Sequence, residues 1–416
     1  MQYYYSSWRE EIQELFDVHE RQQRKDKEMT LLLGIIYVAF ISLGLPDALL
    51  GAAWPSIHGE LGVPVSYAGI ISMIISGGTI ISSLSSDMLT KKMGTGKVTA
   101  VSVAVTAAAL WGFSVANSFW MLCAIALPYG LGAGAVDAAL NNYVALHYKA
   151  RHMSWLHCFW GIGASIGPYI MGACLVGGFH WTGGYRVISL LQIGLTAMLF
   201  ATLYLWKGTK AEEEAGQEES GKTGLLKVLG LSGAREAMVS FFCYCALEQT
   251  AGLWAASYMV MNRGISAQEA AKWGSLFYLG ITAGRFICGF ITMKLSDRNM
   301  VRLGQAVAVG GILLLMLPLG QSVTGVGLIM VGTGCAPVFP ALLHETPDNF
   351  GADLSQAIMG MQMACAYVGT MVMPPLFGMI SGVVGIWLYP FYLLFIVAVM
   401  VVMVERLNRL KKEKAE

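Results

Sequence analysis

Long apolar segments recur along the whole chain, separated by short polar stretches. Each is close to the ~20 residues that a helix needs to span a bilayer. The segments are continuously apolar and do not alternate, which predicts helices and excludes a transmembrane β-barrel. We expect twelve spans, at residues 29–53, 67–86, 98–116, 119–146, 154–177, 185–206, 235–260, 271–293, 300–319, 323–344, 354–380 and 386–404. The pattern therefore predicts an all-α membrane protein.

Basic residues are concentrated on one side of these spans. All 27 lysine and arginine residues except Arg186, Arg263, Lys272 and Arg285 lie on the same side as the tails: in the tails, in the loops, or, for Arg235 and Arg302, at the adjoining ends of spans. Loops rich in lysine and arginine stay in the cytoplasm. The distribution therefore predicts a multi-pass protein of the cell (cytoplasmic) membrane with both termini cytoplasmic.

The longest polar interruption, residues 207–233, divides the spans into two sets of six. It contains Glu212, Glu213 and Glu214 and several glycines, which is typical of a flexible linker. We expect a solvated linker without a regulatory role. The predicted domains are an N-terminal tail (1–28), an N-terminal six-helix bundle (29–206), the linker, a C-terminal six-helix bundle (234–404) and a C-terminal tail (405–416). The N-terminal tail could form a surface helix or stay disordered.

The two sets of spans resemble weak repeats. Pro168 is followed four residues later by Gly172, and Pro374 is followed in the same way by Gly378. Internal repeats with acidic residues in the first helix of each set indicate a secondary transporter with its site near mid-membrane. We therefore expect two pseudo-symmetric six-helix bundles.

Composition narrows the class further. The chain is 56% hydrophobic and 13% charged, against the ~25% charged residues of soluble domains. Its net charge of +1 gives no indication of nucleic-acid binding. All eight cysteines fall in apolar runs and are expected to fill the core. HExxH is missing from the sequence. Residues 216–223 match the Walker A pattern and residues 163–167 match GxSxG, but the first match lies in the polar stretch 207–233 and the second inside an apolar span. Neither follows a predicted strand, as these motifs require, so we do not expect an enzyme.

The fourth span carries the clearest candidate chemistry. Asp137 and Asn141 lie one helical turn apart on one face. A carboxyl group inside a membrane usually marks a substrate or ion path. Asp137 could carry a proton, or it could bind sodium together with the amide oxygen of Asn141. The alternative is a structural acid paired with a helix end or an arginine. Gly130, Gly132, Gly134 and Ala135 should let a neighbouring helix approach closely.

The first and seventh spans each carry a second acidic candidate. Asp47 follows Pro46, which should loosen the first span and expose backbone groups. Asp47 could bind the coupling ion or merely cap that break. Glu248 and Gln249 could hydrogen-bond sugar hydroxyl groups.

Aromatic and other polar side chains complete the candidate set. Trp254 and Tyr258 could cover the apolar side of a sugar or form an interfacial aromatic belt. We place Asn142, His157, Trp160 and Gln362 at the substrate site as well, although His157 could simply bond to a neighbouring helix. Arg285, inside the eighth span, could pair with an intramembrane acid. We favour a structural pairing with the loop that follows.

Several motifs resemble a known family. The loop from Ser83 to Lys97, with Asp87, Lys91 and Gly94, looks like a degraded form of the loop typical of the major facilitator superfamily. Finer matches resemble its fucose:proton symporter family, which includes relatives of the sodium-dependent glucose transporter. These matches are Gly44-x-Pro46-Asp47 with Gly51 and Pro55, Asp137 with Asn141, Leu156-His157 with Gly161, Gly163 and Pro168, Glu248 with Gly252 and Trp254, and Gly332 through Pro340.

The resemblance implies the major facilitator fold and an acid in the first and fourth spans, which correspond to Asp47 and Asp137. The fucose branch has Glu at the second of these positions, so the sugar and the coupling ion stay open.

We expect a symporter that imports a hexose-type sugar with protons or sodium by alternating access, needing no cofactor beyond that ion. Its partners would be the sugar and the lipid bilayer, and we expect a monomer. An alternative is an exporter of amphipathic molecules or drugs, because 24 methionines could line an adaptable cavity. A membrane enzyme or a nutrient sensor is a third possibility. A cavity lined by acids and amides would favour sugar, and one lined by Met and Phe would favour efflux.

Overall fold

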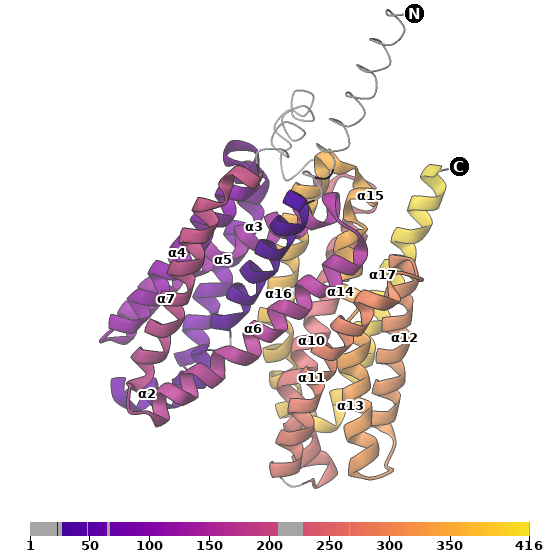
Figure 1. The fold of residues 1–416 in the computed structure, drawn as a ribbon. Coiled ribbons are helices and arrows are strands. Elements are labelled where there is room, and N and C mark those ends of the chain that lie inside the picture. The colour runs from indigo at the N-terminus through magenta and orange to yellow at the C-terminus, as the bar shows by residue number, and fades with distance from the viewer. Residues whose placement is uncertain are drawn as a thin grey trace, which may run out of the picture.

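The structure, a computed structural model, describes residues 23, 27–47, 49–64, 67–206, 228–265 and 267–415. Within these residues the chain forms helices joined by short loops. The predicted linker lies outside the described residues up to position 227, and so does nearly all of the predicted N-terminal tail. Figure 1 shows the helices through α7 gathered on one side and those from α10 onward gathered on the other. We refer to them as the first and second groups.

The first group starts with a helix over residues 27–47. Ala48 is outside the described residues, so the predicted break beside Pro46 is not tested. The helices that follow are α2 (Leu49–Leu61), α3 (Ala68–Met93), α4 (Thr95–Val115), α5 (Phe119–His147), α6 (Ala150–Val176), α7 (His180–Ala201) and the short η2 (Leu203–Trp206).

The second group resumes within the described chain at residue 228. Its helices are α10 (Ala234–Arg263), α11 (Ala267–Ile291), α12 (Asp297–Met316), α13 (Gln321–Cys335), α14 (Val338–His344), α15 (Thr346–Phe350), α16 (Ala352–Val384), η3 (Ile386–Leu388) and α17 (Tyr389–Ala415). The predicted C-terminal tail is therefore not separate from the last span, because α17 continues through it to Ala415.

Ten helices among the described residues are long and apolar enough to cross a membrane. The other two predicted spans correspond to α10, which carries Glu236, Glu248 and Arg263, and to α11, whose apolar stretch is Leu276–Ile291. The all-α membrane fold is confirmed, and the count of twelve spans stays a prediction.

Small residues allow the helices of the first group to touch backbone to backbone. A Cβ added to Gly130 would lie 2.2 Å from the carbonyl oxygen of Ile75, and one added to Gly134 would lie 2.2 Å from that of Thr79. Both carbonyls belong to α3, so α5 can pack this closely only with glycine at these positions. The close approach expected from the glycine pattern is confirmed.

The two groups meet most closely where α3 and α16 cross. A Cβ on Gly360 of α16 would lie 2.4 Å from the carbonyl oxygen of Ser83 on α3. Nearby, the Ser355 hydroxyl donates to Asn142 Oδ1 (2.6 Å) and Gln356 Nε2 donates to Ser86 Oγ (3.2 Å). These contacts join the groups near the ends of α3 and α5.

A second set of contacts closes the same side. Trp155 Nε1 on α6 donates to the Phe286 carbonyl oxygen on α11 (3.3 Å). His344, at the end of α14, bonds to Asp297 Oδ2 (2.6 Å) and to the Tyr148 carbonyl oxygen of the first group (3.2 Å). Both sets lie beside loops on the side of the molecule where the helix over 27–47 begins and α17 ends (Figure 1). We call this the termini side, and the structure is closed there.

Gly360→Ala should weaken this closure, because its methyl group cannot fit against the Ser83 carbonyl without moving α16 away from α3. Spin labels at the exposed positions Met88 and Asp353, introduced as genetically encoded residues, allow the distance between the two groups to be measured by double electron–electron resonance. We expect this distance to lengthen in the variant, or a population with a longer distance to grow.

Gly382→Ala is the matched control. It lies on the same helix, and a Cβ there would meet nothing within 4 Å. Identical distance distributions for Gly360→Ala and the unmodified protein would show that this contact does not hold the two groups together.

Candidate functional site

A cavity of about 640 Å³ lies between the two groups of helices. Its walls come from the helix over 27–47, from α3, α4, α5, α6 and α7, and from α10, α11, α14 and α16. Most of the side chains that face it carry a polar atom: Asp47, Ser76, Thr79, Thr106, Tyr129, Asp137, His157, Trp160, Ser165, Gln192, Tyr244, Glu248, Gln249, Tyr278, Thr282, Arg285, Tyr367 and Thr370. The predicted acids therefore share one cavity.

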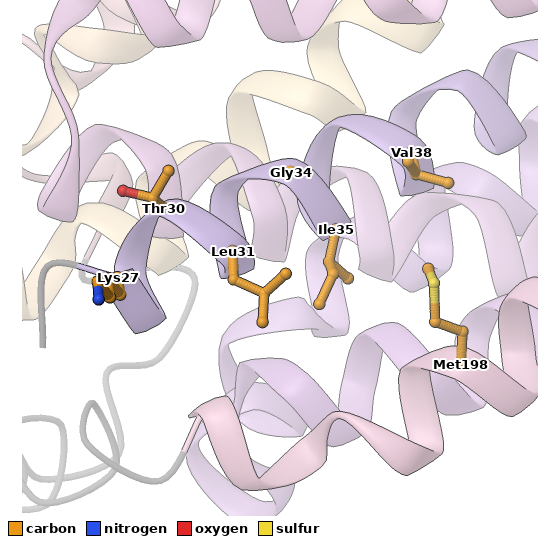
Figure 2. Close-up of a pocket in the computed structure, with 7 residues that line it drawn as sticks. All are labelled: Lys27, Thr30, Leu31, Gly34, Ile35, Val38 and Met198. Carbon is orange, nitrogen blue, oxygen red and sulfur yellow. The ribbon is translucent and has the colours of Figure 1, made fainter. Parts of the chain in front are cut away.

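A second hollow, of about 760 Å³, lies on the outer face of the helix over 27–47 (Figure 2). Apart from Lys27 and Thr30 its walls are apolar, and Met198 of α7 forms its far edge. None of the predicted site residues lies in it, and its shape and chemistry suit a lipid-facing surface. We therefore place the candidate site in the polar cavity.

Asp47 faces the cavity from the first helix. Its Oδ2 accepts a hydrogen bond from Trp160 Nε1 of α6 at 2.8 Å. The backbone makes this pairing possible, because a Cβ on Gly44 would clash with the Trp160 carbonyl oxygen at 2.1 Å. The glycine lets the two helices touch, so the indole reaches the carboxyl group one turn further along.

Asp137 is held by residues from both groups of helices. Asn141 Nδ2 donates to its Oδ1 (2.9 Å), and the Tyr367 hydroxyl of α16 donates to its Oδ2 (3.3 Å). Asn141 Oδ1 in turn accepts from His157 Nε2 at 3.0 Å. Asn141 is fully buried behind the wall and positions Asp137, while its amide oxygen points toward His157.

The second group contributes a buried ion pair. Arg285 Nη2 lies 3.4 Å from Glu248 Oε2 and donates to the Tyr244 hydroxyl at 3.1 Å. The Tyr244 hydroxyl donates to the same Glu248 oxygen. The favoured interpretation of Arg285 as a partner of the following loop was wrong. A guanidinium buried between helices is costly without a paired carboxylate, and Glu248 supplies that carboxylate.

Trp160 lies between Asp47 and the Arg285–Glu248 pair. The guanidinium of Arg285 lies 5.5 Å from the centre of the Trp160 ring, within the range of a cation–π contact. The same indole donates to Asp47. One side chain therefore contacts an acid of the first group and the cation of the second group across the cavity.

Five predicted site residues do not line this cavity. Asn142 accepts from Ser355 at the closed side, and Gln362 Oε1 accepts from Thr346 (3.1 Å). Trp254 Nε1 donates to the Pro374 carbonyl oxygen (3.0 Å), and the Tyr258 hydroxyl donates to that of Leu315 (2.8 Å). Both aromatic residues therefore bond to carbonyl oxygens within the second group, and their contact with a sugar stays a prediction. The fifth, Asn141, contacts Asp137 and His157, which line the cavity.

Sequence reasoning missed several residues that face the cavity. Gln192 is an amide inside an apolar span, where it donates to the Ser42 carbonyl oxygen (2.8 Å) and accepts from Thr106 (2.9 Å). That isolated amide could have been singled out in the same way as Asn141. Tyr244 and Tyr367 give no comparable signal, because a tyrosine in an apolar span usually packs as an aromatic ring.

Asn141→Ala should destabilise the protein, because it leaves His157 Nε2 without an acceptor and Asp137 without one donor. Unsatisfied buried groups cost about 1–3 kcal/mol, although interhelical bonds in membranes average only about 0.6 kcal/mol. We expect a loss of about 1–2 kcal/mol in unfolding measurements in detergent. Asn408→Ala is the control, since this amide is also buried and its Nδ2 has no partner among the described residues. Equal losses in both variants would contradict the role given to Asn141.

The chain is similar to known transporters in sequence and in structure. The family model of the Major Facilitator Superfamily matches residues 36–366. "Bypass of stop codon protein 6" of Saccharomyces cerevisiae is 24% identical over 391 residues, covering 85% of this chain and 77% of that protein.

Two solved transporters share the fold over nearly their whole length. FucP in its outward conformation superposes with a TM-score of 0.74 at 15% identity, covering 91% of this chain and 99% of that one. Another structure describes FucP as the fucose:proton symporter of E. coli. The proton:xylose symporter XylE, bound to 6-bromo-6-deoxy-D-glucose, gives a TM-score of 0.74 at 10% identity, covering 91% and 95%.

The likeness to FucP supports, at the level of structure, the resemblance expected from the motifs. Because the family model spans most of the chain and the fold agrees with it, the protein is a membrane carrier and not an enzyme. The chain belongs to the major facilitator superfamily.

Proposed function

We propose that the protein is a cation-coupled symporter that imports a hexose-type sugar by alternating access. The observation that carries this proposal is the cavity, in which Asp47, Asp137 and Glu248 share one space with amide, hydroxyl and indole groups. Sugar hydroxyl groups donate and accept hydrogen bonds at once, and this mixture of acids, amides and alcohols matches them. The likeness in fold to two sugar symporters supports the same conclusion.

In this proposal Asp137 binds the coupling ion, with Asp47 as a second acid. Tyr367, from the opposite group of helices, donates to Asp137. Neutralising Asp137 weakens that bond, because a charged acceptor forms a stronger hydrogen bond than a neutral one. Ion binding at Asp137 is thereby connected to a contact between the two groups that move during transport.

The orientation of Asn141 bears on which ion, proton or sodium, Asp137 binds. Its NH₂ group faces Asp137 and its oxygen accepts from His157. A sodium ion held by oxygens of both residues would require the amide to turn and lose the His157 bond. A proton on Asp137 requires no such turn, which favours proton coupling.

Closure on the termini side supports import as the direction of transport. If both termini are cytoplasmic, as the basic loops predict, this conformation presents the cavity toward the outside. Sugar and ion would enter there, and the α3–α16 and α6–α11 contacts would open to release them inward.

Export of amphipathic molecules is the second candidate. The 24 methionines of the chain would favour export if they lined the cavity. Among the described residues that line the cavity, however, Met363 is the sole methionine, and Phe40 and Phe339 are the two phenylalanines. The acids, amides and hydroxyl groups among the lining residues therefore favour a sugar over a drug-like substrate.

Uptake into proteoliposomes tests the proposal directly. We expect accumulation of at least one hexose (fucose, glucose, galactose or mannose) against its gradient when a proton or a sodium gradient is imposed inward. Asp137→Asn should abolish accumulation driven by the gradient, because an amide neither exchanges a proton nor carries the charge that attracts sodium. Radiolabelled uptake with each gradient imposed separately identifies the ion.

Asp353→Asn provides the control for loss of an acid, since Asp353 is exposed at the start of α16 and outside the cavity. It should accumulate sugar as the unmodified protein does. Uptake that ignores both gradients would refute coupling, and the absence of uptake for every hexose would favour export or another substrate.

A further inference from the structure

We propose that Glu248 is a charge filter: by neutralising Arg285 it makes the cavity select sugars without charge and reject those that carry a carboxylate. The inference rests on the proposed function, because it concerns which sugars the same cavity admits. It assigns a specificity-determining role to the ion pair in the second group of helices.

Arg285 is fixed in the cavity wall by contacts on several sides. Its side chain is 5% exposed, and Nη2 reaches both Glu248 and Tyr244. The Trp160 ring covers it from the first group. Its Nε has no hydrogen-bond partner among the described residues. The guanidinium is thus held in one orientation in the cavity wall, with its Nε buried.

Without Glu248 this arrangement would suit a carboxylate. Arginine is always charged, and its planar group binds carboxylates with two parallel hydrogen bonds. No lysine or second arginine lines the described part of the cavity, so Arg285 is the one fixed cation that a sugar acid could meet there. Arg285 is therefore the group in the cavity to which an anionic sugar would bind, and its partner Glu248 bears on that binding.

Glu248 makes the pair neutral and leaves the cavity acidic overall. Three carboxyl groups line it, from Asp47, Asp137 and Glu248, against the single guanidinium. Even with Asp47 and Asp137 both neutralised by bound ions, Glu248 still cancels the charge of Arg285. An incoming carboxylate would have to displace Glu248 from Arg285 and leave that glutamate unpaired beside it, which repulsion in a partly dry cavity opposes.

A sugar without charge meets no such obstacle. Its hydroxyl group can donate to the carboxylate of Glu248 and accept from the guanidinium of Arg285 while the two stay paired. The pair then acts as one neutral site with a donor and an acceptor side by side. The same geometry that excludes a sugar acid therefore accommodates a hexose.

The test compares pairs of sugars that differ only in a carboxylate: glucose with glucuronate, and galactose with galacturonate. Acetate serves as the simplest carboxylate. Binding to the purified protein in detergent is followed by tryptophan fluorescence, because Trp160 lies against the guanidinium. We expect the unmodified protein to bind a hexose at least about tenfold more tightly than its uronate, as expected when one charged hydrogen bond decides binding.

Glu248→Gln keeps the shape of the side chain and removes its charge. We expect this variant to bind uronates and acetate at least about tenfold more tightly than the unmodified protein, because Arg285 loses its competing carboxylate. Glu248→Asp keeps the charge and should keep the exclusion of uronates. The double variant Glu248→Gln/Arg285→Gln should lose the gain.

Asp137→Asn is the matched control for charge alone. It also removes one cavity acid, but Asp137 bonds to Asn141 and Tyr367 instead of Arg285. If it gains uronate binding as Glu248→Gln does, the effect comes from overall charge and the filter is refuted. Size-exclusion profiles establish that each variant is folded. The comparison of hexose with uronate binding by the unmodified protein does not depend on any variant.

The outcomes separate this inference from the proposed function. Hexose binding without a gain of carboxylate binding in Glu248→Gln refutes the filter and leaves sugar transport standing. Equal binding of hexose and uronate by the unmodified protein also refutes the filter. A gain of acetate binding without hexose binding by any form supports the filter and counts against a sugar substrate. No binding of either kind counts against both.

Discussion

Ionisable side chains inside apolar helices constrain the centre of this protein. A carboxylate or a guanidinium cannot stay in hydrocarbon without a partner or access to water. Asp47, Asp137, Glu248 and Arg285 meet this requirement by facing one cavity and by bonding to each other or to neighbouring polar groups. The cavity therefore has to lie where the helices of the two groups face each other.

The partners of these charges come from both groups of helices. Tyr367 reaches across to Asp137, and Trp160 bridges Asp47 and Arg285. A change in the charge of one acid therefore changes the strength of a contact between the two groups of helices. This is the physical requirement for coupling ion binding to rearrangement, since a ligand shifts an equilibrium only through contacts that differ between its two states.

Closure of the termini side uses a different kind of contact: Gly360 permits α16 to touch the backbone of α3, so that interface can separate without leaving an ion unpaired.

The helical class, the family resemblance and the clearest candidate side chains were predictable without the structure. Charged residues in apolar runs are conspicuous, so Asp47, Asp137 and Glu248 could be identified from the order of residues alone. Periodicity placed Asn141 beside Asp137, and the hydrogen bond between them confirms it. The glycines of α5 signalled a close helix contact, which the α3 backbone provides. These features are local, because one helical segment contains everything they depend on.

Contacts between residues of different helices could not be predicted in this way. Arg285 pairs with Glu248, 37 positions away, and Tyr367 reaches Asp137, 230 positions away. Trp254 and Tyr258 turn into the second group because carbonyl oxygens of other helices accept their hydrogen bonds there. Helical periodicity fixes the face on which a side chain lies and leaves open which helix that face contacts. The partner depends on how the helices pack, and that packing joins residues far apart in the chain.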